Sequence, residues 1–83
     1  MLITSPAAPR LRTGMGLRLT TIGEGRWRLV DAAGLIVGHI DTYTEARGTR
    51  YRALRYHPTA RTMREIGAFW SLENAVDCLR YAR

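Results

Sequence analysis

The chain has one segment with a clear helical pattern, at its C-terminal end, while the patterned sequence before it resembles β-strands. Ser71 is a favourable helix N-cap, and Glu73 in the first turn suits the positive end of the helix dipole. Apolar residues then recur at three- and four-residue spacing, at Leu72, Ala75, Val76 and Leu79. A single helix can cover only one face of a sheet. The sequence therefore predicts a two-layer α+β domain whose other sheet face is open.

Three segments before the helix are predicted as strands of an antiparallel sheet. Residues 26–30 and 35–40 form a hairpin whose turn ends at Gly34, a residue free to adopt a positive φ. After a connector at 42–48, residues 50–56 form the third strand, which ends before Pro58 because proline cannot donate to the ladder. In the second strand, Gly38 indicates a bulge or the close approach of another backbone.

Residues 64–69 are either a short fourth strand or the lead-in to the helix. The expected fold is thus an antiparallel sheet of three or four strands packed against one C-terminal helix. Residues 1–20 alternate poorly and contain prolines and arginines, which predicts a loose basic N-terminal arm with a strand beginning near 17–22. Residues 21–83 then make up one domain.

The composition of the chain favours a polyanionic partner. Among its 83 residues all 13 basic ones are arginine, and the formal net charge is +6. The segment 47–64 holds six of these arginines and no acidic residue. Arginine binds phosphate in a bidentate fork, so such a concentration is typical of a nucleic-acid-binding surface, although charged runs also serve solubility.

Strand alternation directs several arginines away from the helix. Arg26 and Arg28 lie opposite Trp27 and Leu29 in the first strand, and Arg50 and Arg52 alternate with apolar residues in the third. A β-ribbon fits the major groove of DNA. The candidate nucleic-acid-binding residues are Arg26, Arg28, Arg50, Arg52, Arg55, Arg61 and Arg64. Trp27, Tyr51 and Tyr56 would stack unpaired bases if the target were single-stranded, but core packing is the stronger expectation for Trp27.

Nothing in the sequence predicts an enzyme. His39, His57 and Cys78 are scattered and form neither a nucleophile–base pair nor a zinc-ligand pattern. His39 on an apolar strand is expected to be structural, and Cys78 a small buried helix residue. We expect no catalytic residue, metal, cofactor or small-molecule substrate. The chain lacks an apolar run of the roughly 20 residues that span a membrane and a signal-peptide pattern, so we expect a cytoplasmic protein without membrane contact.

The step from sheet to helix resembles that of a known group of DNA-binding modules. Gly67, Phe69, Ser71 and Ala75 match a Gly-x-Phe-x-Ser/Thr step followed by an early helix alanine. In this the chain is similar to the DNA-binding domains of plant ethylene-response factors and the arm-type binding domains of phage integrases. Asn74 stands where those families often have glutamate, and the chain between Arg55 and Gly67 looks longer than their hairpins.

The resemblance covers about half of the chain, and it implies that sheet-face arginines and a tryptophan contact DNA. The whole chain also resembles small proteins of actinobacteria and their phages. That likeness indicates a probable origin and implies no function.

Two functions follow from these patterns. The first is a small nucleic-acid-binding module, with DNA favoured over RNA, that uses an arginine-lined sheet face. The second is a protein-interaction or dimerisation module, such as a phage or host adaptor that binds an acidic protein surface. The open face discriminates between them. Arginines gathered there favour nucleic acid, whereas exposed apolar side chains favour a protein partner or a homodimer. The apolar candidates are Ile36, Ile40, Leu54 and Tyr56.

Overall fold

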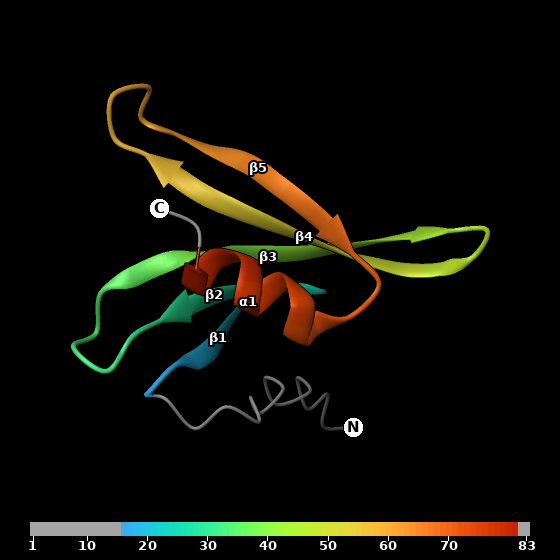
Figure 1. Ribbon diagram of the computed structural model, residues 1–83, viewed down its shortest axis with the longest axis horizontal. Coiled ribbons are helices and arrows are strands. Elements are labelled where there is room, and N and C mark those ends of the chain that lie inside the picture. Colours follow the sequence, from blue (N-terminus) through green and yellow to red (C-terminus); the bar gives the residue numbers. More distant parts are fainter. Residues whose placement is uncertain (1–15, 82–83) are drawn as a thin grey trace, which may run out of the picture.

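The computed structural model describes residues 16–81, which form an antiparallel sheet of five strands followed by one helix (Figure 1). Each strand pairs with its neighbours in the sequence, so the spatial order equals the chain order. The strands are β1 (Arg18–Gly23), β2 (Arg26–Val30), β3 (Ile36–Glu45), β4 (Gly48–His57) and β5 (Thr62–Phe69), and the helix is α1 (Leu72–Tyr81).

The α+β class and the C-terminal helix are confirmed, but the sheet has five strands rather than three or four. The segment 64–69 belongs to the full strand β5. Arg18–Thr20, assigned above to the arm, are the first residues of β1. The other arm residues, 1–15, lie outside the described part of the chain.

The connector expected at 42–48 is also wrong, because β3 continues to Glu45 and the turn is only Ala46 and Arg47. Thr42, Tyr43 and Thr44 are good strand formers. Tyr43, Thr44 and Glu45 are all exposed, so neither side of this segment packs on the core. The segment therefore has no alternation of apolar and polar residues from which a strand could be predicted.

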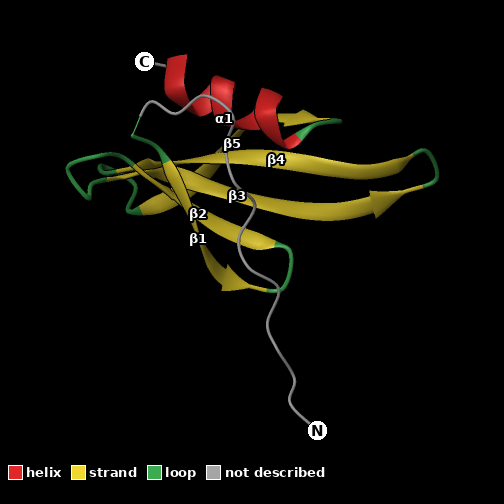
Figure 2. Ribbon diagram, turned by 90° about the horizontal axis from the view of Figure 1, so that it is seen from below, coloured by secondary structure: helices red, strands yellow, loops and turns green. Residues whose placement is uncertain are grey.

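Helix α1 packs on one face of the sheet, over β3, β4 and β5 (Figure 2). Its buried residues are Ala75, Val76 and Leu79, three of the four predicted from the helical spacing; Leu72 packs beside them, half-buried. The sheet contributes Leu29, Ile40 and Ala53, which have no exposed surface. Because cross-strand partners point to the same side, this buried row identifies the helix side of each strand.

Gly38 lets the helix approach the sheet closely. A Cβ built at this position would lie 2.5 Å from the Leu54 carbonyl oxygen and 2.7 Å from Leu79 Cδ2. Any side chain would therefore push α1 and β4 away. The close approach of another backbone, expected from the sequence, is confirmed.

The start of the helix agrees with its predicted cap. Ser71 Oγ accepts a hydrogen bond of 3.1 Å from the backbone N–H of Asn74. This bond satisfies one of the amide groups that lack a partner in the first turn of a helix. The cap fixes where the chain leaves β5 and turns over the sheet.

The face opposite α1 is not covered by any other element of residues 16–81 (Figure 2). We call it the open face. Within the same residues, no helix has the length and apolar character needed to cross a membrane.

Candidate functional site

Four of the predicted arginines lie on the open face. Across the sheet, Arg26 pairs with Asp41, which pairs with Arg52. In the next row Arg28 pairs with His39. Arg50 lies opposite Tyr43. All of these positions alternate with residues of the buried row, so their side chains point away from α1. The structure thus brings together Arg26, Arg28, Arg50 and Arg52.

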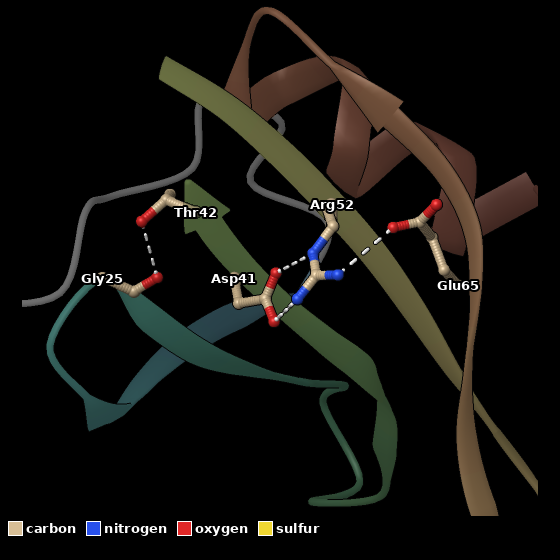
Figure 3. Close-up of polar contacts among 5 residues, drawn as sticks. All are labelled: Gly25, Asp41, Thr42, Arg52 and Glu65. Atoms are coloured by element: carbon tan, nitrogen blue, oxygen red, sulfur yellow. Dashed lines mark hydrogen bonds and ion pairs between the residues drawn. The ribbon is translucent and has the colours of Figure 1, made fainter. Parts of the chain in front are cut away.

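The Arg52 guanidinium interacts with two carboxylates (Figure 3). Its Nε and Nη2 donate to Asp41 Oδ1 and Oδ2 at 2.6 and 2.7 Å, and its Nη1 lies 3.5 Å from Glu65 Oε1. The hydrogen bond with Asp41 raises the pKa of the Arg52 guanidinium. Arg52 is therefore permanently charged, but its charge is already offset within the protein.

Arg50 is held by Trp70 and the end of β5. Its Nη2 donates to the Ala68 carbonyl at 3.0 Å, and its guanidinium carbon lies 4.3 Å from the centre of a Trp70 ring. Its Nε is buried and has no hydrogen-bond partner. Arg50 therefore joins β4 to the β5–α1 corner and presents only part of its guanidinium to solvent.

The arginines of β2 are less constrained. Arg28 Nε lies 3.4 Å from His39 Nε2, to which it donates. Burial, and then the charges of Arg28 and Arg26, lower the pKa of His39. A neutral His39 can accept from Arg28, as expected of a structural histidine. Within residues 16–81, neither Arg26 nor Arg28 forms an ion pair with a carboxylate.

Arg18 belongs to the same surface, although it is not among the site residues predicted from the sequence. It precedes the buried Leu19 in β1, so its side chain lies on the open side, and it is exposed. The signal was the alternation Leu17-Arg18-Leu19, in which both leucines pack on the core. It was missed because the segment was assigned to the arm.

The β1–β2 turn is fixed to β3, and this sets the position of Arg26. Thr42 Oγ1 donates to the Gly25 carbonyl at 3.0 Å (Figure 3). Gly25 has a φ of 63°, and a side chain there would collide with Thr42 Oγ1. Arg26 follows this anchored glycine directly.

A depression with both polar and apolar lining lies beside these arginines. Ile22, Leu54 and Met63 line it together with the polar side chains of Arg26, His39 and Asp41. Tyr56, also on the open side of β4, is 49% exposed, whereas Ile40 is fully buried under the helix. Ile36 is exposed near the β2–β3 turn. The open face therefore combines the arginines with some of the apolar residues expected of a protein-binding surface.

The other three predicted site residues do not lie on the open face. Arg55 and Arg64 are cross-strand partners on the opposite side of β4 and β5 from Leu54 and Tyr56. Arg61 is exposed in the β4–β5 turn, with a φ of 53°. The single site expected from the sequence is thus divided in two.

Trp27 and Tyr51 cannot stack bases on the open face. They lie on the helix side, packed against the core, with ring centroids 6.5 Å apart and an interplanar angle of 22°. The core role expected for Trp27 agrees with this arrangement. Trp70 instead stacks on the open-face residue Arg50.

Among residues 16–81, no three His, Cys, Asp or Glu side chains lie close enough together to hold a metal ion. None of the protein family models, curated proteins or solved structures compared with this chain matches it.

Proposed function

We propose that this protein is a small non-enzymatic nucleic-acid-binding module that uses the open face of its sheet, with DNA favoured over RNA. One observation carries the proposal: Arg18, Arg26 and Arg28 lie on one face of the β1–β2 hairpin, and no carboxylate of residues 16–81 pairs with them. Phosphates would neutralise this group and release counterions, which is the main source of affinity in such complexes.

The two halves of the open face have different roles in this proposal. Arg50 and Arg52 hold β3, β4 and β5 in place. The charge of Arg52 is offset by Asp41 and Glu65, and the Arg50 guanidinium is held by the Ala68 carbonyl and the Trp70 ring. Arg18 and Arg26 make the phosphate contacts. Arg28, fixed through His39, has the planar fork that pairs with guanine in the major groove.

Two further arginines, Arg10 and Arg12, lie a few residues before Arg18 in the sequence. Basic arms often follow a nucleic-acid backbone. A cytoplasmic location, in contact with the nucleic acid of the cell, belongs to the same proposal.

Fluorescence anisotropy with a labelled random DNA duplex tests the proposal. The wild-type protein is titrated at several salt concentrations, beside the variants R18Q, R26Q and R47Q. Arg47 is exposed in the β3–β4 turn next to Glu45, so R47Q controls for the loss of one charge elsewhere. We expect binding that weakens steeply with salt. R18Q and R26Q should each lower the salt slope by about 0.9, the value for one phosphate contact.

Absence of binding at low salt would overturn the proposal. Binding that R18Q and R26Q weaken no more than R47Q would show that the open face is not the contact surface. If the protein does not bind DNA, the depression lined in part by Ile22, Leu54 and Met63 favours the second candidate, an acidic protein partner or a second copy of this chain. Sedimentation equilibrium would then detect the homodimer.

A further inference from the structure

The hairpin of β4 and β5 extends beyond the rest of the sheet as a two-stranded ribbon. The pairing of β3 with β4 ends at His39 and Leu54, whereas β4 and β5 stay paired as far as His57 and Thr62. Residues 55–64 therefore have no third strand beside them. Figure 1 shows this ribbon projecting past β3 and α1. We call it the β4–β5 ribbon.

The β4–β5 ribbon is strongly basic. Between Glu45 and Glu65 the chain has no acidic residue, and the ribbon holds Arg55, Arg61 and Arg64. Arg55 and Arg64 are cross-strand partners. Arg61 and Arg64 are exposed, and neither forms an ion pair within residues 16–81. These two side chains are therefore available to an anionic partner.

The shape of the ribbon selects among anionic partners. The major groove of B-form DNA is roughly 12 Å wide and admits a two-stranded ribbon, with phosphates along both walls. The major groove of duplex RNA is too deep and narrow for this. An exposed turn arginine at the tip and a second arginine on the flank match such a groove.

We propose that the β4–β5 ribbon is a second DNA contact, which enters a groove of duplex DNA and binds phosphates through Arg61 and Arg64. This inference rests on the proposed function but concerns a different surface, because Arg64 lies on the helix side of the sheet and Arg61 lies at the hairpin tip.

The β3–β4 hairpin provides a matched comparison within the same chain. Beyond Asp41 and Tyr51 it too is two-stranded, because neither β2 nor β5 extends along it. Its turn carries Arg47, but Glu45 lies beside it. Two ribbons of similar build thus differ in charge, and only the basic one is expected to bind.

The test compares single variants R61Q, R64Q and R47Q, together with R61Q/R64Q, on one labelled DNA duplex in the full-length protein. We expect R61Q and R64Q each to weaken binding, and the double variant to lower affinity roughly tenfold or more at 0.1 M salt and to reduce the salt slope by about 2. R47Q should bind like the wild type. Thermal unfolding of each variant checks that it is folded, so that a loss of affinity reports on the DNA contact.

The proposal is overturned if R61Q and R64Q bind as R47Q does while the wild type still binds DNA. That result would leave the open face as the DNA contact. If the wild type does not bind duplex DNA at low salt, both the ribbon contact and the proposed function are wrong. If R18Q and R26Q leave DNA affinity unchanged but R61Q and R64Q lower it, the ribbon binds DNA and the open face does not.

Discussion

Single side chains determine how much positive charge the open face presents. Arg52 lies at its centre, but Asp41 accepts two hydrogen bonds from it and Glu65 lies within ion-pair distance. Arg26, two strands away from Arg52, pairs across the sheet with the same Asp41 but forms no ion pair within residues 16–81. Asp41 therefore sets the balance between folding stability and free charge on this face.

Replacing Asp41 with asparagine should weaken folding and strengthen DNA binding. Arg52 is partly exposed, so losing its bidentate partner is expected to cost only about 0.5–1 kcal/mol in the free energy of unfolding. The freed guanidinium adds a phosphate contact. Denaturant unfolding and anisotropy of D41N check both effects, with E45Q as a control for the same charge change away from Arg52. A DNA affinity for D41N that does not exceed that of E45Q would contradict the role assigned to Asp41.

His39 should make folding stability depend on pH. Burial, with the charges of Arg28 and Arg26, lowers its pKa from the ordinary value of 6.5, against an opposing effect of Asp41. Below pH 6.5 the unfolded chain therefore takes up a proton more readily than the folded protein does. Stability should fall as the pH drops from 6.5 towards the folded pKa, and it should be fully present above 6.5.

An NMR titration of the His39 ring protons measures this pKa directly, with H39Q to assign the signals. A value at or above 6.5 in the folded protein would contradict the lowered pKa and the pH dependence of stability that follows from it.

At the scale of elements, the distance between α1 and the sheet is set by a missing side chain. Gly38 in β3 lies against the Leu54 carbonyl and the Leu79 side chain. Substituting alanine should displace α1 and cost about 1–3 kcal/mol, the usual range for overpacking a core. Thermal unfolding of G38A tests this. For comparison, G34A has open space around its Cβ, and any loss there should come from its positive φ alone. A G38A melting temperature equal to that of the wild type would show that the helix does not pack as closely as described.

The elements that could be predicted from the sequence are those with local signals. The Ser71 cap and the helical spacing that ends at Leu79 lie within one short segment, and both were correct. The outer part of β3, at Thr42–Glu45, has no such local pattern because the helix does not pack on it. Strand β1 agrees with the strand expected near 17–22, although residues 18–20 were also counted in the arm.

The contacts within the candidate site depend on the register between strands. The alternation of side chains along a single strand does not determine this register. Asp41 meets Arg52 only because the β3–β4 turn is the two residues Ala46 and Arg47. A longer connector would shift the pairing, and a slip of one residue would move Asp41 to the wrong partner and face. The sharing of one face by Arg26, Arg28, Arg50 and Arg52 followed from alternation, but the neutralisation of Arg52 did not.

For the whole molecule, arginines of the described residues form two basic surfaces. Arg18, Arg26 and Arg28 lie at the β1–β2 side of the open face, and Arg61 and Arg64 lie on the β4–β5 ribbon. Arg50 and Arg52, on β4, serve the fold.

The most direct test is an NMR titration of the isotope-labelled protein with a short DNA duplex at low salt, following backbone amides and arginine Nε–H signals. We expect the largest shifts at Arg18, Arg26 and Arg28, with a second group at Arg61 and Arg64, and small shifts in α1 and at Arg47. Shifts confined to α1, or no shifts at saturating duplex, would contradict the claim that the open face binds DNA.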